Sequence, residues 1–348
     1  MRARDLEYDL PEESIAQTPV EPRSAARLLV DRGPDRPPDH RRVADLPELL
    51  EPGDLIVVND TRVRAARLHL RKATGGEAEV LLLEPTGRAG EWRALVRPGR
   101  RLPPGTVLEH QGVAAVAIGD RVGDDGRRLV TVLDDEAAAR AGTVALPPYI
   151  SSPLRDPERY QTVFARREAS VAAPTAGLHF TDDLLERLER SSVGLARVEL
   201  EVGLGTFRPV TVDHLDEHRM HAERYRIDPG TWERILQAPR VVAIGTTVVR
   251  TLETAAANGQ LEGASELFIR PGFRWRVVDR LLTNFHLPRS TLLALVEAFV
   301  GPRWRDLYRL ALEERYRFLS FGDAMLLTRM AAPAGTGRTA GADEPPVG

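Results

Sequence analysis

The feature that most restricts the possible folds of this sequence is a change of pattern between about Arg62 and Leu133. Six short apolar segments follow one another here with no helical periodicity between them: RVRAARLHLR, EAEVLLLEP, EWRALVRP, GTVLEHQ, GVAAVAIG and RRLVTVL. Turn-forming residues such as Thr86-Gly87 separate them. Short strands at this spacing are typical of a small antiparallel barrel or sandwich.

The flanking regions have another pattern, in which strands alternate with helices. Strands are predicted at residues 55–58, 197–202 and 241–245, and helices at residues 181–190, 246–259, 290–301 and about 303–317. The predicted fold class is therefore α/β, an α/β core domain with an inserted small antiparallel β-barrel domain. The core domain is predicted at residues 1–61 and 149–330, the barrel at residues 62–148, and a disordered Gly/Pro/Ala-rich tail at residues 331–348.

The composition excludes several classes of protein and site. The 348 residues contain no cysteine, which excludes disulfides, thiolate catalysis and cysteine-ligated zinc. No run of about 18 apolar residues is present, and the N-terminus, MRARDLEYDLPEES, lacks the apolar segment of a secretory signal. We therefore expect a cytoplasmic protein with no membrane segment. Because no heptad pattern is present, we also expect a monomer.

Positive charge is concentrated at the start of the predicted barrel, although the whole chain has a net charge of −3. Residues 62–101 contain ten Arg and Lys residues against four Glu, a local excess of six positive charges. Basic side chains of this kind can contact RNA phosphates. The alternative is an ordinary solvated barrel exterior, because successive strand residues point to opposite faces. The candidate RNA-binding residues are Arg62, Arg64, Arg67, Arg71 and Lys72.

Polar residues gather in segments that follow predicted strands or begin predicted helices. Helix N-termini at the carboxyl ends of parallel strands are suited to bind carboxylates or phosphates. Each residue also has a structural explanation, because glycine forms tight turns, threonine caps helices and histidine forms hydrogen bonds in cores. The candidates are Thr175, Gly177, His179, Gly205, Thr206, Thr246, Thr247, Asn284, His286 and Asp323.

The segment HRMHAERY raises the question of a metal site. His218 and His221 are three residues apart and Glu223 follows them, whereas the HExxH motif has histidines four apart with the glutamate between them. A further ligand would have to come from elsewhere in the chain, such as His214 or His179. The segment is therefore a metal site, a catalytic or hydrogen-bonding group, or a plain surface segment.

Several long strings of residues occur in a fixed order along the chain. They are DLIVVNDTRVRAARL, LPPYI, RYQTVFARREASVAAPTAGLHF, VGLGTFRPV, HRMHAERY, VVAIGTTVVRTLET, FIRPGFRWRVVDRLLTNFHLPRSTLLALVEAFVG and YRFLSFGDAM. Together, from about Tyr8 to Met325, they resemble the S-adenosylmethionine:tRNA ribosyltransferase-isomerases of queuosine biosynthesis. The resemblance implies an α/β domain with an inserted β-barrel domain.

The resemblance also implies an activity. The ribosyl group of S-adenosylmethionine would be transferred and isomerised onto 7-aminomethyl-7-deazaguanine at the wobble position of a tRNA. The product would be epoxyqueuosine, and adenine and methionine would leave. S-adenosylmethionine would be a consumed co-substrate, and no other cofactor and no metal would be expected.

The roles implied by this chemistry can be matched to residue types. His179 and His286 are candidates for the base that removes a proton from the ribose 5′ carbon. Candidates for contacts to the leaving groups are Asp60, His221 and Glu223. The methionine carboxylate would suit Thr246, Thr247 or Arg250. The deazaguanine edge would suit Glu199 or Glu201, although both residues also fit a solvated sheet face.

Three alternatives remain at this stage. Leu204, Val248 and Phe321 depart from the residues common in the family, which leaves open a paralogue that acts on another deazapurine or RNA. The second alternative is a metal-dependent hydrolase built on His218 and His221. The third is a non-enzymatic RNA-binding module that uses the barrel and leaves the polar loops without a role.

Overall fold

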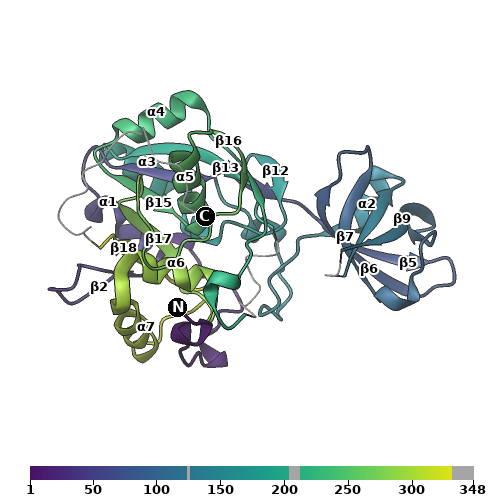
Figure 1. Ribbon diagram of the computed structural model, residues 1–348, viewed down its shortest axis with the longest axis horizontal. Coiled ribbons are helices and arrows are strands. Elements are labelled where there is room, and N and C mark those ends of the chain that lie inside the picture. The colour runs from purple at the N-terminus through teal and green to yellow at the C-terminus, as the bar shows by residue number, and fades with distance from the viewer. Residues whose placement is uncertain (124–125, 204–211, 331–348) are drawn as a thin grey trace.

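The structure is a computed structural model that describes residues 1–123, 126–203 and 212–330 (Figure 1). Its larger part is built on a nine-stranded sheet with the strand order β16-β14-β13-β3-β15-β17-β18-β1-β2. These strands are β1 (Arg27–Val30), β2 (Asp39–Arg42), β3 (Leu55–Asn59), β13 (Gly194–Leu200), β14 (Glu223–Arg226), β15 (Val241–Ile244), β16 (Glu262–Ser265), β17 (Arg280–Asn284) and β18 (Ala324–Thr328). The helices around them are α1 (Leu46–Leu49), α3 (Asp182–Arg190), α4 (Pro229–Gln237), α5 (Thr246–Asn258), α6 (Thr291–Val300) and α7 (Trp304–Glu313).

The central strands β13, β3, β15 and β17 run parallel to one another. Leu55 and Val57 belong to the hydrophobic core on one face of the sheet, and Ile56 and Val58 belong to the core on the other face. A strand that is buried on both faces needs a continuous apolar sequence, which LIVV supplies. The carboxyl ends of the four strands therefore lie at the same edge of the sheet.

Helices cover both faces of this sheet. Val249 of α5, Phe299 of α6 and Tyr308 of α7 pack into one core. Leu46 of α1 and Leu184 of α3 pack into the other core. This arrangement confirms the predicted α/β class.

The predicted barrel is confirmed as well. Its strands are β5 (Arg67–Lys72), β6 (Glu77–Pro85), β7 (Glu91–Arg97), β8 (Val107–His110), β9 (Val113–Val122) and β10 (Arg127–Val132). They are antiparallel in the order β5-β6-β7-β10-β9-β8, and pairing of β5 with β8 closes the ring. The two-residue strand β11 (Gly142–Thr143) pairs with β5. Figure 1 shows the barrel as a separate lobe that two connecting segments join to the larger part.

Several local predictions were wrong. Residues 62–71 were predicted as one strand, but β4 (Thr61–Val63) pairs with β12 (Arg167–Ser170) in a separate two-stranded sheet, and only β5 enters the barrel. The barrel also contains a helix that was not predicted, α2 (Asp135–Ala141), whose buried alanines join the barrel core. Its small apolar residues give a weaker periodic signal than leucine would.

The N-terminus of α5 differs from the expected one. Gly245 is the N-cap residue, with a φ of 91°, and Thr246 is the first residue of the helix. Few side-chain-bearing residues adopt this φ, which favours glycine at the turn from β15 to α5.

The structure does not test the predicted domain boundaries, and it does not describe the predicted tail. The domain boundaries at residues 61/62 and 148/149 stay predictions, and the tail at residues 331–348 lies outside the described residues. Among the described residues, no helix combines the length and the apolar character needed to cross a membrane.

Candidate active site

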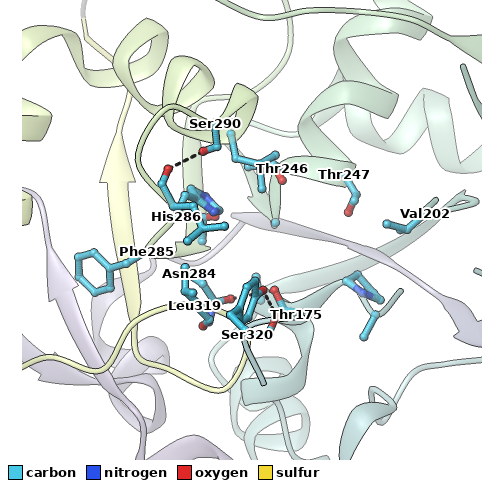
Figure 2. A pocket seen from close by; sticks show the side chains of 18 residues that line it. Thr175, Val202, Thr246, Thr247, Asn284, Phe285, His286, Ser290, Leu319 and Ser320 are labelled. Atoms are coloured by element: carbon cyan, nitrogen blue, oxygen red, sulfur yellow. Dashed lines mark hydrogen bonds between the residues drawn. The ribbon is translucent and has the colours of Figure 1, made fainter. Parts of the chain in front are cut away.

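A cavity of about 60 Å³ lies at the carboxyl ends of the parallel strands (Figure 2). Its walls come from the segments that follow β12, β13, β15 and β17, and both α5 and α6 begin beside it. This is the location at which open α/β sheets bind ligands. Five residues predicted from sequence line the cavity: Thr175, Thr246, Thr247, Asn284 and His286.

His286 forms part of the cavity wall just beyond β17. Its Nε2 lies 2.9 Å from the hydroxyl of Thr283, and its backbone N–H donates to the hydroxyl of Tyr308 at 3.0 Å. Its carbonyl accepts a hydrogen bond from the hydroxyl of Tyr8. Burial lowers the pKa of His286 to about 3, so the imidazole is neutral near pH 7.

His179 ends the 3₁₀ helix η7 (Thr175–His179) and lies behind Asn284 rather than in the wall of the cavity. The Asn284 side-chain nitrogen lies 3.3 Å from His179 Nε2 and donates to the Leu319 carbonyl at 3.0 Å, while the Asn284 oxygen accepts from Thr175 at 3.3 Å. If the amide donates to Nε2, the imidazole carries its proton on Nδ1. Burial, followed by the charges of Arg23 and Arg317, lowers the pKa of His179 to about 4.

Gly177 and Asp323 support this side of the site from behind. A Cβ atom on Gly177 would lie 2.7 Å from the ring of Phe164, so only glycine allows this close packing. The Asp323 carboxylate accepts the backbone N–H groups of Arg27 and Arg317, each at 2.8 Å. Burial raises the pKa of Asp323, and its bonds fix the start of β1 beside β18.

Glu223 and Arg250 form a buried ion pair outside the cavity. Besides Glu223, the Arg250 guanidinium binds the carbonyls of Leu267 at 3.2 Å and Ser265 at 3.1 Å. Glu223 also accepts the backbone N–H of Gly203 at 3.0 Å. The sequence predicted that Glu223 and Arg250 contact the substrates. In the structure, their contacts instead hold α5, β14 and the segment after β13 together.

The rest of the HRMHAERY segment does not gather metal ligands. The ring of His218 packs edge-on against Phe268, with centroids 5.5 Å apart. His221 lines a different groove together with Glu223. In the part of the chain that the structure describes, no three His, Asp or Glu side chains are placed to share a metal ion, so the hydrolase alternative finds no third ligand there.

Asp60, Glu199 and Glu201 lie beyond the cavity. Burial, and after it the charge of Glu199, raises the pKa of Asp60, which follows β3. Arg167 binds Glu199 with an Nε–O distance of 2.8 Å and Glu201 with an N–O distance of 3.2 Å. Gly205 and Thr206 lie outside the described residues.

The groove lined by His221 has a volume of about 410 Å³ and lies between the barrel and the large sheet. Arg64, Arg93 and Arg127 line it on the side of the barrel. The guanidinium of Arg64 lies 5.1 Å above the ring of Trp92. We refer to this space below as the barrel groove.

The other predicted RNA-binding residues have local partners. Arg62 pairs with Glu158, Arg67 with Glu79 at 3.0 Å, and Arg71 with Glu77 at 3.4 Å. Lys72 donates to the carbonyl of Arg101 at 2.6 Å. Only Arg64 of the predicted set lines the barrel groove.

Sequence reasoning missed some residues of the cavity. Tyr149 and Ser320 line it and share a hydrogen bond of 2.8 Å between their hydroxyls. Ser290, expected to cap α6, does so by accepting the N–H of Leu293, and it also lines the cavity. Tyr149 lies in the string LPPYI and Ser320 in the string YRFLSFGDAM, but neither residue follows a predicted strand or begins a predicted helix.

Comparisons with known proteins agree with this architecture. A family model described as queuosine biosynthesis protein matches residues 3–327. Proteins named S-adenosylmethionine:tRNA ribosyltransferase-isomerase are similar to this chain. The one from Rubrobacter xylanophilus is 51% identical over 94% of this chain and 98% of that protein. The one from Moorella thermoacetica is 50% identical over 94% of this chain and 100% of that protein. A crystal structure of S-adenosylmethionine tRNA ribosyltransferase from Thermotoga maritima is 38% identical, with a TM-score of 0.53 over 92% of this chain and 99% of that one.

The predicted resemblance is thereby confirmed. The matched region includes both the large sheet and the barrel, and it ends within β18. The chain belongs to the queuosine biosynthesis protein family.

Proposed function

We propose that this chain transfers and isomerises the ribosyl group of S-adenosylmethionine onto 7-aminomethyl-7-deazaguanine at the wobble position of a tRNA. The reaction yields epoxyqueuosine-tRNA, adenine and methionine. The family and the names of the relatives support this activity. The observation that supports it within the fold is the cavity at the carboxyl edge of the sheet, where a neutral histidine faces the beginnings of two helices.

The activity is tested by incubating the purified protein with S-adenosylmethionine and a tRNA that carries the aminomethyl-deazaguanine. Chromatography should detect free adenine and methionine only when this tRNA is present. Adenine release with an unmodified tRNA or with another RNA would instead favour a paralogue with a different substrate. No adenine from folded protein would contradict the proposed reaction.

His286 is proposed as the base that removes the proton from the ribose 5′ carbon, which the adjacent sulfonium acidifies. It lies in the cavity wall and is neutral near pH 7, as a base must be before the reaction. His179, which lies behind Asn284, is proposed to orient that amide. The remaining assignments to Asp60, His221, Glu199 and Glu201 stay predictions.

The tRNA is proposed to approach along the barrel groove. Five arginines and three glutamates line this groove, which leaves a positive balance for phosphates. Anticodon-loop bases are unpaired, so presenting one of them to a pocket requires no opening of a duplex. Trp92, under Arg64, offers an aromatic surface near the same place.

Further proposals concern the state of the protein. We propose that it acts as a monomer in the cytoplasm and needs no cofactor beyond the consumed S-adenosylmethionine. We also propose that residues 62–148 form a domain of their own and that residues 1–61 and 149–330 form the catalytic domain. Closed pairing within the barrel and its position beside the sheet support this division.

A further inference from the structure

The beginning of α5 combines several features at one wall of the cavity. This helix has 13 residues, and its N-cap is Gly245, which has no side chain to accept hydrogen bonds from the first turn. By contrast, Ser290 caps α6 beside it through a bond from Leu293. The first N–H groups of a helix have no partner within the helix, and they carry the positive end of its dipole.

Thr247 supplies a second and independent observation. Thr247 as a whole is 7% exposed, and its hydroxyl has no hydrogen-bond partner among the described residues. Two other hydroxyls and three arginine Nε atoms among the described residues also lack a partner, but Thr247 is the member of this set that lines the cavity. In Figure 2 its hydroxyl points from α5 into the space between Thr246 and Val202. A buried hydroxyl without a partner is costly, so its position here indicates a ligand.

The surroundings favour an anionic group of a few atoms. The described residues that line the cavity include no Asp or Glu, so no fixed negative charge repels an anion. The volume of about 60 Å³ accommodates a carboxylate. Arg250, the basic residue nearest in sequence, binds Glu223 and two carbonyls and is therefore engaged elsewhere.

We propose that the N-terminus of α5, together with the hydroxyl of Thr247, binds the carboxylate at the amino-acid end of S-adenosylmethionine, an assignment that rests on the proposed function. The helix supplies N–H donors and a favourable dipole, and Thr247 supplies an additional O–H donor.

The first test changes the ligand and leaves the protein intact. Binding of S-adenosylmethionine and of decarboxylated S-adenosylmethionine, which keeps the amine and the nucleoside, is measured by equilibrium dialysis at one pH and ionic strength. The wild-type protein should bind the decarboxylated compound roughly 10- to 100-fold more weakly, the range for hydrogen bonds to a charged group. Equal affinity for the two compounds would overturn the proposal.

The second test changes the hydroxyl. Thr247→Val should weaken binding of S-adenosylmethionine about tenfold or more and change binding of the decarboxylated compound by less than about twofold. Thr247→Ser, which keeps the hydroxyl, should bind like the wild type. Thr251→Val is the matched control, because Thr251 is buried in the same helix but donates to the Thr247 carbonyl and does not line the cavity. A loss of the same size for both compounds in Thr247→Val would contradict the assignment.

The outcomes separate this proposal from the proposed function. If the wild-type protein releases adenine but binds the two compounds equally well, the proposed activity is supported and the carboxylate site is contradicted. Selective binding of the carboxylated compound without adenine release under any condition would support the carboxylate site and contradict the proposed activity. If Thr247→Val weakened binding of tRNA and not of S-adenosylmethionine, the site would hold an RNA phosphate and the proposal would be wrong.

Discussion

The two buried histidines differ in what they can contact. His286 is in the cavity wall, whereas Asn284 separates His179 from the cavity. Both are neutral near pH 7, because burial lowers their pKa values to about 3 and about 4. Position therefore distinguishes them, and their charge state does not.

His286→Gln should lower kcat for adenine release by roughly 10²- to 10⁴-fold, the usual contribution of a general base, while leaving the affinity for S-adenosylmethionine nearly unchanged. Turnover in the presence of the modified tRNA and equilibrium binding provide the two measurements. His179→Gln, as the comparison variant, should affect turnover less, because Asn284 lies between its side chain and the cavity. Full turnover by His286→Gln would remove it as the base.

The same histidines predict a loss of stability in mild acid. Their folded-state pKa values, about 4 and about 3, lie below the unfolded value of about 6.5, so the unfolded chain binds more protons between these limits. Stability should therefore fall as the pH decreases below about 6.5, by about 2 kcal/mol per histidine at pH 5. Urea unfolding at pH 7 and pH 5 measures the effect, and a variant with Gln at both positions should show a smaller decrease. An equal decrease in that variant would assign the effect to other groups.

At the scale of elements, α5 connects the cavity to two other parts of the sheet. Arg250 binds Glu223 of β14, and Glu253, on the next turn, accepts the backbone N–H groups of Arg276, Val277 and Val278 ahead of β17. The helix that begins at the cavity is thus fixed at its middle by two buried glutamates. Glu223 and Arg250 therefore hold a helix whose first turn lines the cavity, although neither residue lines it.

Glu223→Gln should destabilise the protein by about 3–5 kcal/mol, because it leaves the buried guanidinium of Arg250 without its counter-charge. The free energy of unfolding in urea is the measurement. Glu262→Gln on the neighbouring strand β16 is the control, since Glu262 is exposed and its change should cost less than about 0.5 kcal/mol. Equal costs for the two variants would show that the pair contributes little.

At the scale of the whole molecule, the barrel groove lies between the barrel and the part built on the large sheet, so that one RNA could contact both. Arg64 and Arg93 line it from the barrel side, and Arg167 and Arg224 line it from the other side. An RNA in this groove would contact both parts at once. Its affinity should therefore depend on ionic strength through residues of the groove rather than through those on the outside of the barrel.

Replacing Arg64 and Arg93 together by Gln should weaken tRNA binding and reduce the slope of log Kd against log salt concentration by about 2. Arg71→Gln is the control, because Arg71 is exposed and faces Glu77 away from the groove. Filter binding over a series of salt concentrations measures both quantities. An unchanged slope in the double variant, or an equal change in Arg71→Gln, would place the RNA elsewhere.

Local patterns predicted those parts of the fold that depend on neighbours in sequence. The strand at Leu55–Asn59, the helix that Ser290 caps and the barrel strands all followed from periodicity and turn residues. The ion pair of Glu223 with Arg250 did not, since nothing in either segment specifies its partner across the sheet. Five cavity residues were predicted because the strands that precede them end at one edge of the sheet. Ser320 comes from the segment before β18, which lacks this strand-to-helix pattern.

The position of β18 has a consequence for how the chain folds. This strand, which begins at Ala324, lies between β17 and β1, so Leu28 of β1 meets its partner Ala324 only after nearly 300 further residues have been made. At about 5–20 residues per second, β1 and β2 wait roughly 15–60 s during synthesis without the strand that joins them to the rest of the sheet. Completion of the sheet, and with it the Asp323 contacts behind the cavity, therefore has to wait until β18 has been made.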